Sequence, residues 1–420
     1  MKITDISVRV FSHTSREVKD SDGHTHPGDP HQVRQALLTI TTDDGSQGHC
    51  FAPTEVVRPF LIDRFVKVVL MGQDPFDREK LWQGMAHWQR GSGAMLTDRT
   101  LSIVDLALWD LAGRKLGVPV YKLIGGKVHD RIPAYANGWY TGERTPEAFA
   151  AAAKKVVDRG YLGLKFDPFG NGNLELSRPE FRKSIELIEA VYSVTGENVQ
   201  MFIEMHGRFA PHQAVEIARA IEPLRPGWIE EPCRPEDIPA LRYVRDHTDI
   251  PIATGERLYH AQQYRELLQE RLCHIIQPDL NQCGGLLETK KICSTAESYS
   301  IMAAPHNVGG IVTTVATLHM LFGMRNAKIL EHFNDFVDAD IKQVGSPYPE
   351  VVDGHFALPT GAGWGIELNE AFLESSQPRT ENGIISDPGL NMFVKADWNK
   401  RDTAIALERE TKSEDVPSNL

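Results

Sequence analysis

The sequence predicts an α/β fold with an eight-stranded (β/α)8-type barrel and a second domain of the α+β class. From about residue 131 onward, short apolar segments that end in a polar residue alternate with helix-like stretches, which is typical of parallel βαβ units. Eight such segments fit within residues 131–350, and about 220 residues is an ordinary size for a barrel. The flanking residues 1–130 and 351–420 lack this alternation and are predicted to form the second domain.

The first 50 residues are predicted to form antiparallel strands. The segments ITDISVRVF and RQALLTITT alternate apolar and polar residues, and DDG at 43–45 favours a turn. Residues 15–31 are polar and rich in glycine, proline and histidine, so we expect a long mobile loop that is either disordered or a lid. Residues 57–118 are predicted to be helical, with an apolar stripe that ends at Gly117 before Pro119 (Leu101, Val104, Leu108 and Leu111).

The barrel strands are predicted from eight short apolar segments. These are residues 131–137, 162–167, 199–204, 227–231, 250–256, 274–279, 300–306 and 327–331. The stretches between them carry helix signals. In the first of these stretches, Thr145 is suited to the N-cap, Pro146 to the first turn and Gly160 to the end of the helix.

Net charge and cysteine content narrow the class of protein. A formal charge of −12 argues against nucleic acid or an anionic membrane surface as a partner, although a bound metal can still attract a small anion. No apolar run approaches the roughly 18 residues that a membrane span needs. The five cysteines are scattered without a CxxC pair, and the N-terminus lacks the apolar core of a signal peptide, so we expect a cytoplasmic protein.

Six predicted strands end in a residue that can bind a metal or carry a proton: Glu204, Glu230, Glu256, Asp279, His306 and Glu331. Their successive spacings are 26, 26, 23, 27 and 25 residues, which fits one strand, one helix and two short loops. Spacing alone is weak evidence, because 57 of the 420 residues are acidic. The stronger observation is that each residue closes an apolar strand, which on a barrel places it at the C-terminal mouth, where active sites lie.

Glu204, Glu230 and Glu256 are the candidate metal ligands. Carboxylates that meet at a barrel mouth raise each other's pKa unless a cation lies between them. Oxygen ligands alone favour a hard ion, Mg²⁺ before Mn²⁺ or Ca²⁺. The alternative for each acid is a solvated or ion-paired strand end. His206 follows Glu204 by two residues, so on a strand both side chains would point the same way, as a polar pair or as a ligand beside a proton carrier.

Several motifs resemble the enolase superfamily and fit its mandelate-racemase-like branch best. They are SIVDLALWDLAGRKLGVPVYKLIGG (102–126), WIEEP (228–232), TGE (254–256), QPDLNQCGG (277–285) and the later PH and LE. The resemblance covers nearly the whole chain. It implies a modified TIM barrel, (β/α)7β, with an α+β capping domain formed by both termini. Sites of this superfamily use a lysine or histidine base with Mg²⁺ stabilising an ene-diolate.

Carried onto this chain, the resemblance implies a metal site and a base. Glu204, Glu230 and Glu256 match the three Mg²⁺ ligands. His306 with Asp279 matches a His–Asp dyad, in which the carboxylate orients the imidazole and raises its basicity.

The resemblance also implies roles for four further residues. Glu331 matches the carboxyl group that hydrogen-bonds the developing ene-diolate. Lys165 matches the first lysine of a Lys-x-Lys motif, and Asp167 replaces the second, which argues against a racemase or epimerase with two bases. His206 matches the acid that protonates the departing 3-hydroxyl group in acid-sugar dehydratases.

The pattern is most similar to gluconate and galactonate dehydratases. We therefore expect a carbon–oxygen lyase (a hydro-lyase) that converts a sugar acid of the D-gluconate or D-galactonate type, with R configuration at C2, into a 2-keto-3-deoxy sugar acid. The family also implies a homo-oligomer. Candidate substrate-binding residues are Asp167, Asn137, Trp139, Arg208 and His24, although Asp167 could instead cap a turn and Trp139 could pack in the core.

Three alternatives remain open at this point. The first is dehydration of an aldarate such as galactarate, or of a pentonate, on the same scaffold. The second is a barrel glycosidase with paired carboxylates, which the His–Asp dyad argues against and which would keep its activity in EDTA. The third is a sugar-acid-binding protein without activity, which turnover of any sugar acid would dismiss.

Overall fold

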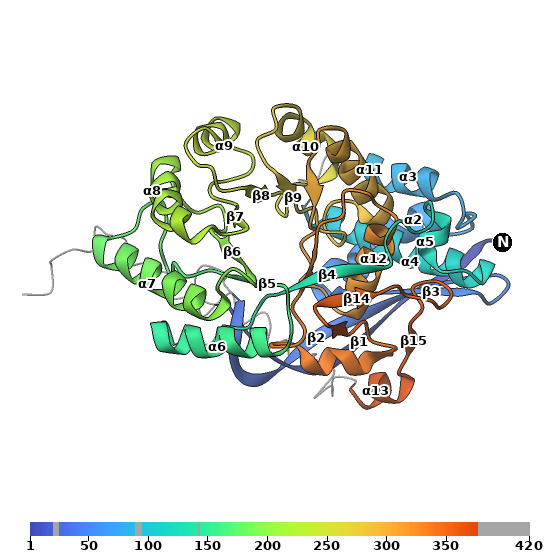
Figure 1. Ribbon diagram of the computed structural model, residues 1–420. Coiled ribbons are helices and arrows are strands. Elements are labelled where there is room, and N and C mark those ends of the chain that lie inside the picture. Colours follow the sequence, from blue (N-terminus) through green and yellow to red (C-terminus); the bar gives the residue numbers. More distant parts are fainter. Residues whose placement is uncertain (20–24, 89–94, 141–142, 377–420) are drawn as a thin grey trace, which may run out of the picture.

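Eight parallel strands form the barrel at the centre of the molecule (Figure 1). The computed structural model describes residues 1–19, 25–88, 95–140 and 143–376. The strands are β4 (Arg131–Ala136), β5 (Gly163–Phe166), β6 (Gln200–Glu204), β7 (Trp228–Glu230), β8 (Ile252–Thr254), β9 (Ile275–Ile276), β10 (Met302–Ala303) and β11 (Leu330–His332). Neighbours pair in parallel from β4 to β10, β11 pairs in parallel with β4, and a bridge between Ala303 and Ala327 closes the ring.

A helix follows each of the first seven barrel strands. These helices are α6 (Pro146–Asp158), α7 (Arg178–Thr195), α8 (Pro211–Ile221), α9 (Ile238–Arg245), α10 (His260–Gln269), α11 (Gly285–Ser298) and α12 (Ile311–Phe322). A 3-10 helix, η5 (Ala339–Val344), follows β11. The order confirms the predicted (β/α)7β barrel. The predicted start of α6 is also confirmed, because the Thr145 side chain accepts a hydrogen bond from the Ala148 amide and Pro146 occupies the first turn.

One layer of apolar side chains fills the barrel below its mouth. The layer contains Tyr135, Phe202, Trp228, Ala253, Ile275, Ala304 and Ile329, all buried. The rings of Phe202 and Trp228 stack with 3.5 Å between their centroids. Gly163 and Gly227 leave room for this stack, because an added Cβ would lie 2.7 or 2.5 Å from the Phe202 ring. Side chains alternate along a strand, so residues two positions after this layer point into the barrel mouth.

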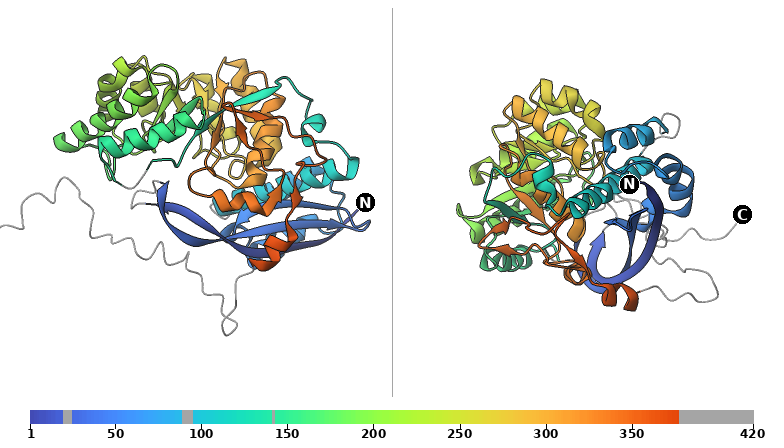
Figure 2. Two further views of the ribbon diagram at one scale, coloured as in Figure 1. Left: turned by 60° about the horizontal axis from the view of Figure 1, so that its bottom comes forward. Right: turned by 90° about the vertical axis from the view of Figure 1, so that its right-hand side faces the viewer.

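The N-terminal region forms an antiparallel sheet and a group of helices beside the barrel (Figure 2). The strands β1 (Ile3–Lys19), β2 (Thr25–Thr42) and β3 (Gln47–Pro53) pair in that order. The helices are η1 (Thr54–Val57), α1 (Pro59–Leu61), η2 (Ile62–Val66), α2 (Lys67–Leu70), α3 (Arg78–Trp88), α4 (Met95–Leu116) and α5 (Val120–Leu123). The predicted apolar stripe of α4 is buried. This helix lies so close to β3 that a Cβ at Gly48 would be 2.2 Å from the Ala107 carbonyl oxygen.

Residues 15–31 differ from the long loop that the sequence predicts. β1 and β2 remain paired as far as Lys19 and Thr25, with an irregularity in register between Ser15 and Glu17. The described part of this segment is therefore a two-stranded ribbon. A polar sequence can form such a ribbon because its ladder is made by backbone groups, whatever the side chains are. The backbone amide of Arg16 attaches the ribbon to the loop after β11, donating to the Val337 carbonyl at 2.6 Å.

The C-terminal segment packs on both the barrel and the N-terminal sheet. β14 (His355–Ala357) pairs antiparallel with the first half of β4 and with β13 (Val351–Val352), whereas β12 (Gly345–Ser346) pairs with β15 (Glu367–Leu368). The last described helix, α13 (Glu370–Ser375), lies beside the N-terminal sheet in Figure 2, where Glu370 pairs with Arg9 at 2.7 Å. The domain limits stay a prediction, with residues 1–130 and 351–420 in the capping domain and residues 131–350 in the barrel.

Asp110 of α4 joins three distant parts of the chain. Its buried carboxylate accepts the backbone amide of His49 at 3.0 Å, the backbone amide of Trp364 at 2.9 Å and the Arg114 guanidinium at 2.9 Å. Burial raises the pKa of this carboxyl. The three donors stabilise the carboxylate in a buried environment, where a charge without partners would cost several kcal/mol.

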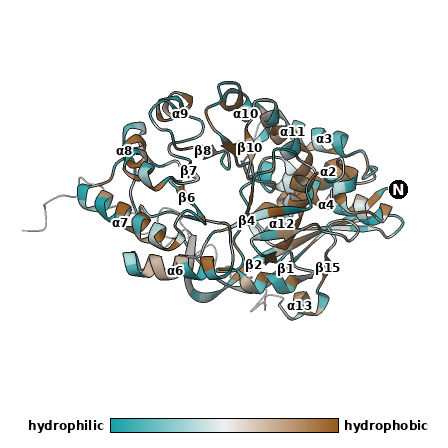
Figure 3. Cartoon of the chain, viewed as in Figure 1, coloured by the Kyte–Doolittle hydropathy of each residue, from teal (hydrophilic) through white to brown (hydrophobic). Residues whose placement is uncertain are grey.

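Hydrophobic residues gather on the strands and on the helix faces that cover them, and hydrophilic residues are frequent on outer helices such as α7 (Figure 3). In the described part of the chain, no helix combines the length and the apolar character that crossing a bilayer requires. All five cysteines are buried, and none of them forms a disulfide.

Two buried histidines make the fold sensitive to acid. His319 accepts the Tyr121 amide on Nδ1 and contacts the Trp364 carbonyl through Nε2, and His332 lies between the hydroxyls of Tyr161 and Tyr348. Burial lowers the pKa of each imidazole from 6.5 to about 4. The unfolded chain therefore binds these protons first as the pH falls, and stability that is present above pH 6.5 is lost between pH 6.5 and 4.

At pH 5 each of these histidines is expected to reduce the free energy of unfolding by about 2 kcal/mol relative to pH 8. Denaturant titrations at both pH values measure this loss. His319→Gln cannot take up the proton, so its stability should depend less steeply on pH between 7 and 5. An equally steep dependence in this variant would contradict the assignment.

Candidate active site

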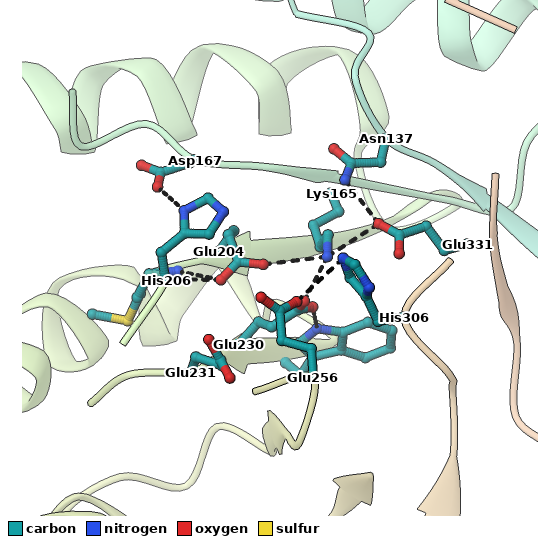
Figure 4. A network of polar contacts seen from close by, with 12 residues as sticks. Asn137, Lys165, Asp167, Glu204, His206, Glu230, Glu231, Glu256, His306 and Glu331 are labelled. Atoms are coloured by element: carbon teal, nitrogen blue, oxygen red, sulfur yellow. Dashed lines mark hydrogen bonds and ion pairs between the residues drawn. The ribbon is translucent and has the colours of Figure 1, made fainter. Parts of the chain in front are cut away.

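Three carboxylates meet at the mouth of the barrel. Glu204 and Glu230 are the last residues of β6 and β7, and Glu256 follows β8 by two residues. One oxygen from each lies within 4.8 Å of the other two, and Figure 4 shows the side chains converging from neighbouring strands. Glu204 and Glu230 are buried, and Glu256 is partly exposed. The three predicted ligands therefore form one cluster, here called the carboxylate cage.

Lys165 of β5 contacts the cage from the side. Its buried ammonium lies 2.5 Å from a Glu230 oxygen, 3.2 Å from Glu204 and 3.1 Å from Glu331. Burial lowers the pKa of Lys165, but the acids around it, Glu230 first, raise this pKa by more. The pKa of Lys165 is therefore well above its ordinary value. Lys165 is therefore a fixed positive charge at the barrel mouth and is not suited to act as a neutral base.

The cage has the chemical character of a site for a hard divalent cation. Burial, followed by repulsion from Glu204, raises the pKa of Glu230 to about 8, because the single ammonium of Lys165 does not compensate for the clustered acids. The indole N–H of Trp228 supports the second Glu230 oxygen at 2.9 Å. Oxygen ligands from three adjacent strands suit Mg²⁺, which is held by a few carboxylates and keeps other positions for water or substrate. The residues present therefore fit this ion.

His306 and Asp279 form a dyad on one side of the cage. The imidazole Nδ1 lies 2.6 Å from an Asp279 oxygen, and Nε2 lies 3.5 Å from Glu256. Asp279 is itself fixed by the Asn281 backbone amide at 2.7 Å and the Gln282 side chain at 3.2 Å. Burial lowers the pKa of His306, but Glu256 and Asp279 outweigh it and raise this pKa to about 10. Nε2 is thus the basic nitrogen that faces the cage.

Glu331 closes the ring of charges opposite the cage. One oxygen accepts the Asn137 side-chain amide at 2.7 Å and the Lys165 ammonium, and the other accepts the Asn307 backbone amide at 2.8 Å. Although burial raises the pKa of Glu331, Lys165 and His306 lower it below the ordinary value. Asn137 therefore orients Glu331, and its role as a substrate ligand stays a prediction.

A second dyad lies on the other side of the cage. His206 Nδ1 is 2.6 Å from Asp167, and Arg208 donates to the same oxygen at 2.6 Å. The other oxygen of Asp167 accepts the Phe169 backbone amide, so this residue caps a turn as well as holding the histidine. The sequence raised Asp167 and Arg208 as substrate ligands, but both are engaged with His206 and with the loop after β5, where Arg208 donates to Gly170 and Gly172.

The direction of His206 differs from the prediction. The strand ends at Glu204, and His206 has φ +50° in a tight turn whose amide donates to the Glu204 carboxylate at 2.8 Å. The simple alternation of a strand therefore does not reach His206, and its ring turns toward Asp167 while the Glu204 side chain extends toward Lys165 (Figure 4).

Two family models together cover most of the chain. Residues 148–372 match the description "Enolase C-terminal domain-like", and residues 16–125 match "Mandelate racemase / muconate lactonizing enzyme, N-terminal domain". The chain belongs to the enolase superfamily. Its barrel and its smaller antiparallel sheet are those of this superfamily, and the predicted membership is confirmed.

Relatives within the enolase superfamily carry dehydratase names. A D-gluconate dehydratase of Thermoproteus tenax is 36% identical over 345 residues, which cover 80% of this chain and 69% of that protein. A D-gluconate/D-galactonate dehydratase of Picrophilus torridus is 34% identical over 341 residues, covering 80% and 87%. The crystal structure of a D-glucarate dehydratase of Agrobacterium tumefaciens complexed with magnesium superposes with a TM-score of 0.78 at 34% identity, covering 90% of this chain and all of that one.

One of the proposed substrate contacts, Trp139, is buried beside this superfamily site. Trp139 is only 3% exposed and packs against Phe149 and Phe166, while its indole N–H donates to the Lys165 carbonyl at 2.8 Å. It supports the end of β5 and offers almost no surface to a ligand, because an aromatic residue at this position is needed to fill the space behind the strand. His24 lies outside the described residues.

Glu231, which lies beside the cage (Figure 4), has no role predicted from the sequence. It is fully buried with φ +41°, and Arg257 pairs with one of its oxygens at 2.5 Å. Burial, followed by repulsion from Glu256, raises its pKa well above the ordinary value. The doubled acid in WIEEP and the arginine directly after Glu256 were the available signals, but a sequence does not show that they pair.

Proposed function

We propose that this protein is a Mg²⁺-dependent hydro-lyase that dehydrates a sugar acid of the D-gluconate or D-galactonate type. The observation that carries the proposal is the pair of imidazole–carboxylate dyads, His306–Asp279 and His206–Asp167, on either side of one carboxylate cage. Elimination of water α,β to a carboxylate needs one group to take the C2 proton and another to protonate the departing hydroxyl. The dehydratase names of relatives at 36% and 34% identity support this choice of reaction.

His306 is the base in this proposal. Its Nε2 takes the proton from C2, and Asp279 holds Nδ1 so that the lone pair of Nε2 faces the cage. The negative charge of Glu256 is the largest of the effects that raise the pKa of His306. When this charge is neutralised, the pKa falls, and the neutral imidazole that can accept a proton is favoured. When bound to Glu204, Glu230 and Glu256, Mg²⁺ supplies the positive charge that makes a proton next to a carboxylate acidic enough to remove.

Lys165 stabilises the charge that develops on the substrate carboxylate, and Glu331 holds the Lys165 ammonium in place. The ammonium donates hydrogen bonds to an oxyanion, and it is preorganised because three acids already hold it in place. Glu331 is itself oriented by the Asn137 side chain and the Asn307 backbone amide.

His206 is the acid that completes the elimination. As the C3–O bond breaks, Nε2 of His206 gives its proton to the leaving hydroxyl, which departs as water. The remaining enol gains a proton at C3 and loses the proton of its C2 hydroxyl, which gives the 2-keto-3-deoxy acid. Asp167 and Arg208 fix the imidazole for this transfer. One oxygen of Asp167 contacts His206 Nδ1 and accepts a hydrogen bond from Arg208, which holds that oxygen in place.

Glu230→Gln is expected to weaken Mg²⁺ binding by more than the about 10–100-fold that is typical when a residue behind a ligand is replaced. The amide removes one anionic ligand and leaves the Trp228 contact possible. Isothermal titration with MgCl₂ measures the change, and Glu147→Gln on the outer helix α6 is the control. Equal affinity in the Glu230 variant and the wild type would remove Glu230 from the ligand set.

A screen of sugar acids with Mg²⁺ tests the proposed reaction directly. D-gluconate, D-galactonate, a pentonate, galactarate and D-glucarate are incubated with the protein, and 2-keto products are detected colorimetrically. We expect turnover of the hexonates and its loss in EDTA. Absence of a 2-keto product from every acid would overturn the proposal, and activity that persists in EDTA would contradict its metal dependence.

An aldarate is the second candidate substrate class. The full length of a D-glucarate dehydratase, in its complex with magnesium, superposes on 90% of this chain. This similarity favours keeping diacids in the screen. A racemase or epimerase is less consistent with the site, because Asp167 occupies the position of a second lysine base and is engaged with His206 and Arg208. A cytoplasmic location and a homo-oligomeric assembly stay predictions.

A further inference from the structure

Gln277 faces the interior of the barrel directly below the mouth. Ile275 belongs to the apolar layer that fills the barrel, and Gln277 is two residues further along β9. The extended backbone continues to this point, because the Gln277 amide donates to the Thr254 carbonyl at 3.0 Å and the Ile276 carbonyl accepts the Ala304 amide at 3.0 Å. Alternation therefore directs Gln277 to the same side as Ile275, one level nearer the cage.

The strands on either side of Gln277 carry the cage and the base. β8 leads to Glu256 and β10 leads to His306, and these two side chains are 3.5 Å apart. Continuing the strand register, the residues beside Gln277 are Gly255 after β8 and Ala304 after β10, which contribute little or no side chain. The amide of Gln277 thus lies in the space below the contact between Glu256 and His306.

This amide is fully buried without a hydrogen-bond partner. Gln277 is 0% exposed, and among the described residues neither its Oε1 nor its Nε2 has a partner. The hydroxyl of Tyr135, in the layer below, is also buried and unpartnered. An unsatisfied buried amide costs about 1–3 kcal/mol, and most buried polar groups in folded proteins are paired. Glu230 and Glu331, at the same level on other strands, are also polar but have hydrogen-bond partners, whereas the Gln277 amide has none among the described residues.

We propose that Gln277 is a positioning residue for the carboxylate cage, and that its amide holds a water molecule between the barrel floor and the cage. A buried water needs two to four polar partners, and the oxygen and nitrogen of the Gln277 amide and the cage oxygens together supply them. When the cation occupies the cage, this water is held in place by hydrogen bonds. It then bridges Gln277 to the ligand carboxylates and so orients them. This inference rests on the proposed function, because it requires the cage to bind Mg²⁺.

The experiment compares Gln277→Met with the wild-type full-length protein. Methionine keeps the length of the side chain and removes both hydrogen-bonding groups. We expect Mg²⁺ to bind the substrate-free variant about 10–100-fold more weakly in isothermal titration. In the metal-free state the variant should melt at the wild-type temperature or above it, because an unpaired buried amide has been removed.

Gln213→Met is the matched control. Gln213 is equally buried at 4% exposure, but its amide is satisfied by the Leu176 backbone amide and the Glu216 carboxylate, each at 3.0 Å. This variant should melt at a lower temperature and bind Mg²⁺ with wild-type affinity. Gln277→Ala repeats the test with a side chain too small to clash.

Two results would overturn the proposal: wild-type Mg²⁺ affinity in both Gln277 variants, or a metal-free melting temperature that falls in Gln277→Met as it does in Gln213→Met. The second result would show that the amide is part of the structural core. If the wild type itself bound no Mg²⁺, the proposed function would fail together with this inference. A wild type that binds Mg²⁺ beside unaffected Gln277 variants would contradict the inference alone.

Discussion

His306→Asn is expected to abolish both dehydration and exchange of the C2 proton with solvent deuterium, each falling by about 10²–10⁴-fold or more. Asparagine keeps a donor that can bond Asp279 but has no basic nitrogen facing the cage. Proton removal is the first chemical event, so a lesion in the base stops every later step. The control is His355→Asn, a histidine of β14 whose ring contacts only the Asp353 carbonyl among the described residues.

Exchange is measured by NMR on a substrate identified in the sugar-acid screen, at saturating Mg²⁺. Binding of Mg²⁺ to the variant, measured separately, shows that the cage is intact. Retained exchange in His306→Asn would transfer the role of base to another group, and Lys165, whose ammonium lies 2.5 Å from Glu230, is the candidate. The strongly raised pKa of that lysine argues against this outcome.

His206→Asn is expected to separate the two halves of the reaction. Without its acid the enzyme should lose dehydration by about 10²–10⁴-fold, while His306 still removes and returns the C2 proton. The measurement is therefore a pair of rates on one sample, deuterium exchange at C2 and formation of the 2-keto product. Loss of both rates with unchanged Mg²⁺ binding would show that His206 is not simply the acid.

The partner of His206 can be tested in the same way. Asp167→Asn leaves the turn at Phe169 possible but replaces the carboxylate that fixes Nδ1. It should reduce dehydration less than His206→Asn does, again with exchange retained. A variant that loses exchange as completely as His306→Asn would indicate that Asp167 acts on the cage instead of on His206.

The positions of the proposed catalytic groups along the barrel were accessible from the sequence. A residue that closes a parallel strand must lie at the mouth, so Glu204, Glu230 and Glu331 could be placed together without any coordinates. The pairing of His306 with Asp279 came instead from the resemblance to the enolase superfamily, and the adjacent strands β9 and β10 bring the two residues together.

The partners of these groups were less predictable, because contacts beyond the strand ends depend on turns. Asp167 could be assigned to substrate, to a turn or to a histidine with equal justification until the φ of +50° at His206 fixed the direction of that ring. Trp139 follows a strand end just as Asn137 does, yet one packs behind β5 and the other bonds Glu331. The ribbon of residues 15–19 and 25–31 is built from backbone pairing, which leaves no hydrophobic pattern to read.

The contacts of Asp110 set the order in which this protein can mature on the ribosome. One carboxylate joins residues 49, 110 and 364, so the early sheet has its final neighbour only after almost the whole described chain has left the exit tunnel. β4, the first barrel strand to be synthesised, must likewise wait for β11 and β14. A nascent chain stalled before these segments emerge would expose unfinished sheet edges, whose unpaired backbone groups can pair with other chains.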